Sequence, residues 1–129
     1  MRTVMIVLRS NCGMLDLASV VEALRSARDP NGEASYLLTT CAYGQDSLQA
    51  EEPWIRVQAA HDITSAPLDI DTLILPNSSV SDLLDQDLEC SAFLARRSKS
   101  IRRIVSLGNG VLLAAAAGMT RGQTVAADS

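Results

Sequence analysis

The residues best placed to do chemistry lie in a glycine-rich turn between an apolar run and an alanine-rich stretch. Residues 104–107 are apolar enough to predict a buried strand, and residues 111–117 have strong helix propensity. Gly108, Asn109 and Gly110 stand between them. A strand, a tight turn and a helix in this order predict an elbow at the carboxyl edge of a parallel sheet. In enzymes with this layout the turn presents a nucleophile, and the start of the helix binds an oxyanion.

The turn in this chain carries no nucleophile. Gly108 has no side chain, Asn109 has only an amide, and Ser106 lies in the preceding strand, where we expect it to point elsewhere. The free N–H groups at the start of the helix remain, and they suit a carboxylate or an amino-acid-like ligand. The pattern therefore favours binding over covalent catalysis. A glycine at position 108 is also what a strained turn alone would select.

The same stretch resembles the class I glutamine amidotransferase-like superfamily, in the branch shared by PfpI-type proteins and the sensor domains of AraC-type transcription regulators. That branch typically reads Cys-Thr-Gly-Ala-Phe-Leu-Leu-Ala-x-Ala-Gly-Leu-Leu-x-Gly, and residues 108–122 align with it without a gap. The family cysteine falls on Gly108. The resemblance therefore implies the family fold, and the glycine removes the usual nucleophile.

Two further segments carry the resemblance. Family members often read Leu-Leu-Asp-Leu-Ala-Gly-Pro-x-Glu-x-Phe, which matches residues 14–24 and puts Asp16 at the acid that faces the cysteine. The pattern Asp-x-Leu-x-Val-Pro-Gly-Gly ends at residue 78, with Asn77 and Ser78 in place of the two glycines. Those two positions often serve the oxyanion site in the family. The resemblance thus implies a ligand-binding set composed of Asp16, Asn77, Ser78, Gly108, Asn109 and Gly110.

Each chemical reading has a simpler alternative. Asp16 is also an acid at the start of a helix, where the dipole favours it. Asparagine tolerates left-handed backbone angles, so we expect the turn at Asn77 to survive without its glycine. The only histidine, His61, has no metal-ligand spacing around it and is expected at the surface. Cys12 lies just before the first helix and is the one candidate for a displaced nucleophile.

Other apolar runs predict the rest of an α/β domain. They indicate strands at residues 4–8, 34–41, 69–76 and 123–126, helices at 15–24 and from 81 or 82 to about 97, and a rim hairpin within 45–58. With the resemblance, this predicts one domain over residues 1–129. We expect a three-layer, flavodoxin-like, mostly parallel sheet with helices on both faces. By resemblance a complete domain continues further, so we expect an incomplete C-terminus that leaves apolar surface open.

Composition limits the class of partner. The 129 residues are 47% hydrophobic and 20% charged, and the net charge of −4 argues against a grip on a nucleic-acid backbone. The three cysteines are odd in number and widely spaced, which suits a reducing cytoplasm. No apolar stretch has the length of a signal core or a membrane span. We expect a cytoplasmic protein without a metal or cofactor.

The resemblance implies two alternative functions. The first is a non-catalytic small-molecule-sensing and dimerisation domain of an AraC-type transcriptional regulator. Such a domain would form a homodimer, and DNA would be bound only by a C-terminal helix-turn-helix part that we expect to lie outside this chain. The second is a PfpI-like small enzyme of hydrolase, hydratase or glyoxalase type, in which Cys12 would replace the lost nucleophile.

Overall fold

The computed structural model describes residues 2–44, 47–50, 52, 54–65, 69–77, 85–97, 100–108 and 115. Its main sheet has the strand order β5-β2-β1-β6-β7, and every neighbouring pair in it is parallel. The strands of this sheet are β1 (Arg2–Val7), β2 (Tyr36–Ala42), β5 (His61–Asp62), β6 (Thr72–Leu75) and β7 (Arg103–Ser106). The other elements are the helices α1 (Met14–Ser26) and α2 (Asp85–Arg97) and an antiparallel hairpin of β3 (Ser47–Gln49) and β4 (Arg56–Gln58).

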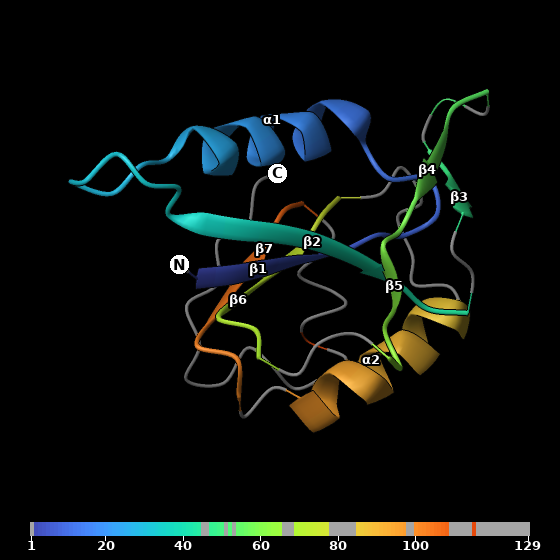
Figure 1. Cartoon of the computed structure of the whole chain (residues 1–129). Helices are drawn as coiled ribbons and strands as arrows, with labels where there is room; N and C mark the ends of the chain where they lie inside the picture. The colour runs from blue at the N-terminus through green and yellow to red at the C-terminus, as the bar shows by residue number, and fades with distance from the viewer. Residues whose placement is uncertain are drawn as a thin grey trace.

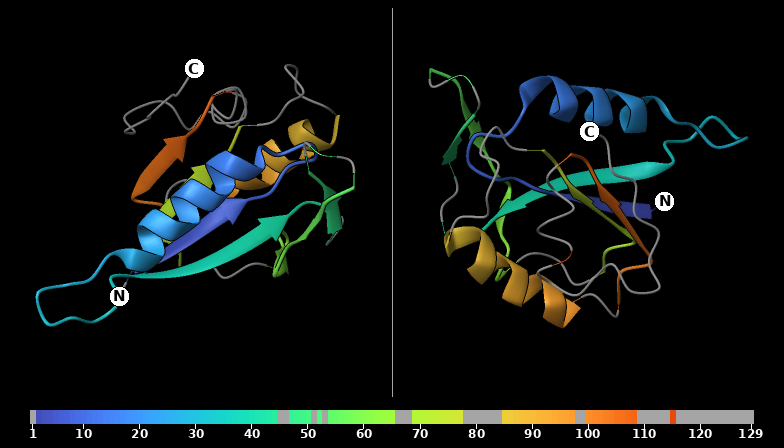
Figure 2. Two further views of the ribbon diagram at one scale, coloured as in Figure 1. Left: turned by 90° about the horizontal axis from the view of Figure 1, so that it is seen from above. Right: turned by 180° about the vertical axis from the view of Figure 1, so that it is seen from behind.

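The two helices lie on opposite faces of the sheet, which gives three layers (Figures 1 and 2). The reason is the direction of the crossovers. The chain moves from β1 to β2 toward one edge of the sheet and from β6 to β7 toward the other. Right-handed crossovers in opposite directions place their helices on opposite faces. The predicted three-layer, mostly parallel architecture is therefore confirmed.

Strand β1 supplies side chains to both faces of the sheet. Its residues Met5 and Val7 belong to a buried cluster on the α2 side, together with Leu73, Leu75, Ile104 and Leu94. Its residues Val4 and Ile6 belong to a second cluster on the α1 side, with Leu17, Val20, Val21 and Leu24 of α1 packed against it. A central parallel strand is covered on both faces, which is why its sequence is apolar without alternation.

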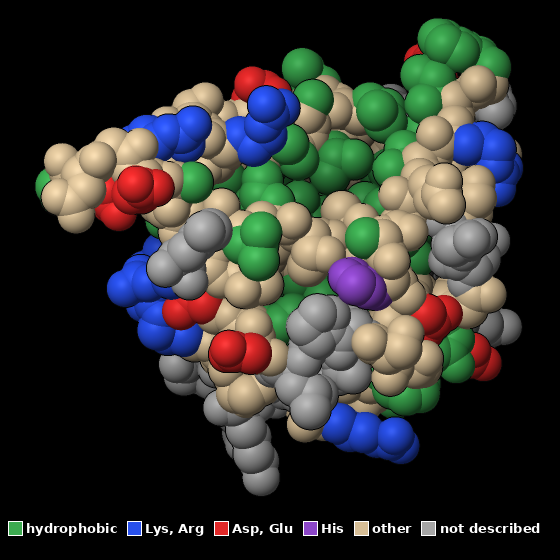
Figure 3. Space-filling model, viewed as in Figure 1, with side chains coloured by type: hydrophobic (Ala, Val, Ile, Leu, Met, Phe, Trp, Pro, Cys, Tyr) green, Lys and Arg blue, Asp and Glu red, His purple; other side chains and the backbone are tan. Residues whose placement is uncertain are grey.

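Helix α1 covers its face of the sheet incompletely. None of its side chains with a described exposure is buried. A cavity of about 390 Å³ opens on the β2 side of the helix, lined by Ile6, Val21, Arg25, Tyr36, Leu38, Thr39, Thr40 and Ala60. Figure 3 shows hydrophobic side chains in a hollow below α1 on this side. A second cavity of about 220 Å³ lies on the β7 side of the helix. Apolar surface is therefore open on both sides of α1.

The predicted elements correspond closely to the observed ones where the structure describes them. The rim hairpin is confirmed as β3 and β4, and it lies beside the carboxyl ends of β1 and β2 (Figure 1). The edge strand β5, only two residues long, was not predicted because so short a segment has no hydrophobic pattern. The predicted strand at residues 123–126, and the predicted helix at 111–117 apart from residue 115, lie outside the described residues.

An ion pair joins the amino-terminal ends of β6 and β7. The Arg102 side chain donates to both carboxylate oxygens of Asp71, from Nε at 2.6 Å and from Nη2 at 3.1 Å. The Thr72 hydroxyl donates to the same carboxylate at 2.7 Å. The hydrogen bond from Arg102, assisted by that from Thr72 and by the charges of Arg102 and Arg2, lowers the pKa of Asp71 from 3.8 to about 2. The carboxylate is therefore more stable in the folded chain than in the unfolded one.

We predict that Asp71→Asn destabilises the fold at neutral pH by on the order of 1 kcal/mol, because Arg102 is half exposed and solvent screens the pair. A depressed folded-state pKa contributes stability above the unfolded value of 3.8 and loses it as the pH falls toward about 2. The difference in unfolding free energy between wild type and variant should shrink across this window. Urea denaturation at several pH values measures it.

The control for this substitution is Glu22→Gln. The Glu22 carboxylate pairs with Arg25 at 3.2 Å, but both side chains are about two-thirds exposed, so little stability depends on the pair. A stability difference for Asp71→Asn that stayed constant from neutral pH down to pH 2 would contradict the ionic origin of the effect.

Candidate functional site at the carboxyl edge

The carboxyl ends of β1, β6 and β7 meet at one edge of the sheet because all three strands are parallel. Asn77 follows β6 and Gly108 follows β7 at this edge. The Gly13 N–H, directly before α1, donates to the Asn77 carbonyl at 3.2 Å. This bond brings the start of α1 to the same place. We call Arg9, Gly13, Pro76, Asn77 and Gly108 the carboxyl-edge cluster.

Gly108 is required at its position for two separate reasons. Its φ is +52°, a left-handed conformation that glycine adopts without steric cost. In addition, a Cβ built on Gly108 would lie 2.6 Å from Cγ and 3.0 Å from Cβ of Asn77, and it would overlap Oδ1. The Asn77 side chain therefore occupies the space where a side chain at position 108 would begin. Asn77 and Gly108, two positions singled out by the resemblance, are therefore in direct steric contact.

The structure brings two of the six predicted ligand-binding residues together, Asn77 and Gly108. Asp16 is the third residue of α1, close in sequence to Gly13, but its side chain lies outside the described part. The remaining three, Ser78, Asn109 and Gly110, also lie outside the described residues.

The turn at Asn77 does not use the left-handed backbone angles that asparagine tolerates. Among the described residues, the only one other than glycine with a positive φ is Asn11, at 62°. Asn11 lies in the loop between β1 and α1, where its N–H donates to the Gln49 carbonyl of β3 at 2.7 Å. This left-handed residue therefore lies in the loop that contacts the rim hairpin.

Arg9 is a charged residue at this edge that sequence reasoning missed. It follows β1 and is only 4% exposed. Its Nη1 donates to the Pro76 carbonyl at 3.5 Å, so the guanidinium lies against the backbone that leads into Asn77. The one feature of the sequence that could have identified Arg9 is its position directly after a strand predicted to be buried, at the carboxyl edge of the sheet.

Cys12, His61 and Ser106 are the remaining residues that the sequence analysis considered. Cys12 is fully buried and forms an isolated parallel bridge with Ala50. His61 is half-buried in β5, beside β2. Ser106, expected to point away from the turn, is fully buried, and its hydroxyl has no hydrogen-bond partner among the residues that the structure describes. Among the described residues, no three His, Cys, Asp or Glu side chains are arranged to hold a metal ion.

Comparison with solved structures identifies the fold. A ThiJ/PfpI family protein from Pseudomonas syringae matches with a TM-score of 0.73 and 18% identity, over 94% of this chain and 48% of that one. DJ-1beta from Drosophila melanogaster matches with a TM-score of 0.69 and 11% identity, over 92% and 61% of the two chains. This chain has the ThiJ/PfpI and DJ-1 fold. No family model and no curated protein sequence matches it.

One protein of the same fold is a regulator by name. An AraC family transcriptional regulator from Pseudomonas putida matches with a TM-score of 0.64 and 16% identity, over 95% of this chain and 64% of that one. In each of these three comparisons the chain spans less than two-thirds of the matched protein. The family resemblance read from the sequence is thus confirmed at the level of the ThiJ/PfpI fold. Within the described ranges, neither helix has the length and apolar character that crossing a membrane requires.

We predict that Gly108→Ala destabilises the chain by about 2–4 kcal/mol, because the new methyl group meets Asn77 and the backbone is left-handed. In an Asn77→Gly background the same change should cost only about 1–2 kcal/mol, the cost of the backbone conformation. Chemical denaturation of the two single variants and the double variant measures this coupling as a double-mutant cycle.

Gly32→Ala is the matched control. Gly32 also has a positive φ, of +81°, but nothing lies within 4 Å of a Cβ placed there. Its cost should equal that of Gly108→Ala in the Asn77→Gly background. Purely additive effects of the substitutions at positions 77 and 108 would show that the Asn77 side chain does not restrict position 108.

Proposed function

We propose that this chain is a non-catalytic small-molecule-sensing and dimerisation domain of an AraC-type transcriptional regulator. The observation that carries the proposal is the pair Asn77 and Gly108. The position of the family nucleophile has no side chain, and a carboxamide fills the space beside it. An amide donates and accepts hydrogen bonds but is a poor nucleophile. Such a site can hold a molecule without forming a covalent bond to it.

The carboxyl-edge cluster offers a polar group to a small ligand. Asn77 supplies an amide beside the turn at Gly108, and an amide N–H can donate to a carboxylate. A small carboxylate or an amino-acid-like molecule matches this group. The matching AraC family regulator supports the regulatory context. DNA binding in this proposal belongs to a separate domain, and the sensing domain forms a homodimer.

We predict that a small carboxylate or amino acid binds the folded protein and that Asn77→Ala weakens it about tenfold, the effect of one lost hydrogen bond to a charged group. Isothermal titration calorimetry across small carboxylates, amino acids and amines measures binding. Gln49→Ala is the control, because Gln49 is an exposed side chain on the neighbouring hairpin. Absence of heat with every compound, from a protein that unfolds cooperatively, would contradict the sensing role.

The alternative function is a PfpI-like small enzyme with Cys12 as the displaced nucleophile. Cys12 precedes Gly13, which hydrogen-bonds to Asn77, so its backbone lies next to the carboxyl-edge cluster. Its side chain is fully buried, however, and a substrate would reach the thiol only after local opening.

We predict no esterase, hydratase or glyoxalase turnover above background for the wild type, and no change on Cys12→Ala. The physical reason is that the described residues of the carboxyl-edge cluster include no exposed thiol or hydroxyl. Assays with activated esters, isocyanides and methylglyoxal measure this. Turnover that disappears in Cys12→Ala, with the fold intact by circular dichroism, would replace the sensing proposal by the enzymatic one.

A further inference from the structure

A second cavity lies on the α1 face of the sheet, toward the ends where β6 and β7 begin, and none of the residues of the carboxyl-edge cluster lines it. It has a volume of about 220 Å³ and lies between α1 and the strands β1, β6 and β7. Six of the residues that line it are aliphatic: Val4, Val20, Ala23, Leu24, Ile74 and Val105. The volume and lining suit a short hydrocarbon chain, which would leave water on entering it.

The polar lining of this cavity is confined to Tyr36, Thr72 and Arg103. The Thr72 hydroxyl already donates to Asp71 and is therefore engaged. Arg103 is exposed, and within the described residues its guanidinium has no carboxylate partner. Among the described residues, Arg103 thus supplies a positive charge without a carboxylate partner in a mostly apolar cavity.

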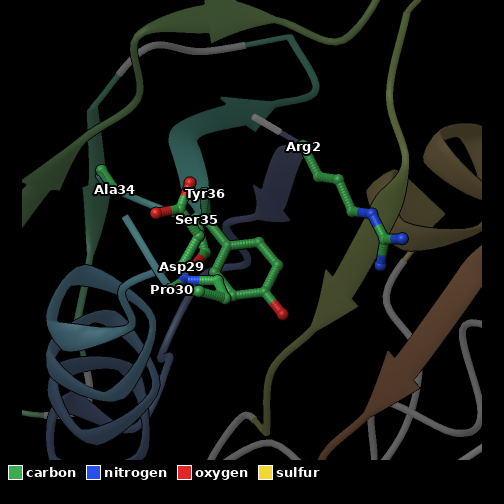
Figure 4. Close-up of a pocket in the computed structure, with 6 residues that line it drawn as sticks. All are labelled: Arg2, Asp29, Pro30, Ala34, Ser35 and Tyr36. Carbon is green, nitrogen blue, oxygen red and sulfur yellow. The ribbon is translucent and has the colours of Figure 1, made fainter. Parts of the chain in front are cut away.

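The neighbouring charged side chains are engaged with carboxylates or lie beside them. Arg102 is neutralised by Asp71, and Arg2 is close enough to Asp71 to influence the pKa of that carboxyl. Arg2 and Tyr36 also line an adjacent cavity of about 390 Å³. Figure 4 shows the ring of Tyr36 beside Asp29 and Pro30, whereas the side chain of Arg2 extends away from that group. The Asp29 carboxylate accepts hydrogen bonds from the Asn31 and Glu33 N–H groups.

We infer that the cavity between α1 and β7 binds an amphipathic monocarboxylate, a molecule with a short aliphatic or aromatic body and one carboxylate. The body packs against the aliphatic lining, and the carboxylate pairs with Arg103. The guanidinium forms two parallel hydrogen bonds with a carboxylate, which is its preferred geometry. Neither Asn77 nor Gly108 lines this site, so it is separate from the proposed sensing site.

The groove on the other side of α1 does not meet the same requirements. It is also partly apolar, but its arginine, Arg25, already pairs with Glu22 at 3.2 Å. Its lining includes Thr39 and Thr40, and the Thr40 hydroxyl accepts a hydrogen bond from the Ala60 N–H. The two sides of α1 can therefore be compared within one protein. Among the described residues Arg103 has no carboxylate partner, whereas Arg25 is paired with Glu22.

The test is a titration of the full chain with octanoate, followed by amide chemical shifts in NMR spectra. Binding should shift the amides that line the cavity, with a dissociation constant on the order of 1 mM for so small a ligand. Arg103→Gln should weaken octanoate about tenfold and leave the neutral analogue octan-1-ol unchanged. Ala23→Phe should abolish both, because the new ring fills the cavity from an exposed position on α1.

Two variants serve as controls. Arg25→Gln should leave octanoate binding unchanged, and so should Asn77→Ala, which separates this site from the proposed sensing site. The inference is overturned if octanoate does not bind the wild type. It is also overturned if octanoate shifts the amides around Arg25 instead, or if Arg103→Gln weakens octanoate and octan-1-ol equally.

Discussion

The structure depends on the burial of strand β1 between two parallel neighbours. The five residues from Val4 to Leu8 are each at most 3% exposed, and β1 pairs with β2 on one side and with β6 on the other. Alternate side chains of this strand belong to the clusters on the two faces. Each helix therefore packs on the sheet through residues that β1 supplies. The loop that leaves its carboxyl end also contributes Arg9 and Gly13 to the candidate site.

The two ends of the sheet differ in chemistry although the same strands form both. At the carboxyl end, the amide side chain of Asn77 lies against Gly108, which has no side chain. At the amino-terminal end, Arg102 and Asp71 join β6 to β7, and Arg103, without a carboxylate partner among the described residues, lines a mostly apolar cavity. The first arrangement suits recognition of a small polar molecule, and the second suits an apolar body with an anionic head.

The sequence was sufficient to predict those parts of the fold that have local signals. The apolar runs around Val4 and Leu73 predicted the central strands, and the helical spacing of Leu17, Val20 and Leu24 predicted α1 and its inner face. The edge strand β5 has too few residues to show a period. The ion pair between Asp71 and Arg102 joins residues 31 positions apart, and no local pattern reports such a contact. The steric contact between Asn77 and Gly108 likewise depends on the pairing of β6 with β7. From the sequence the two residues therefore looked independent, whereas in the structure they are in contact.

The overlap between Asn77 and position 108 also links how the two codons can change. A codon change that placed a larger residue at position 108 would bring its Cβ against the Asn77 side chain on a left-handed backbone. Such a residue fits only if the Asn77 side chain moves or is itself replaced. The range of residues that one position tolerates therefore depends on the residue at the other.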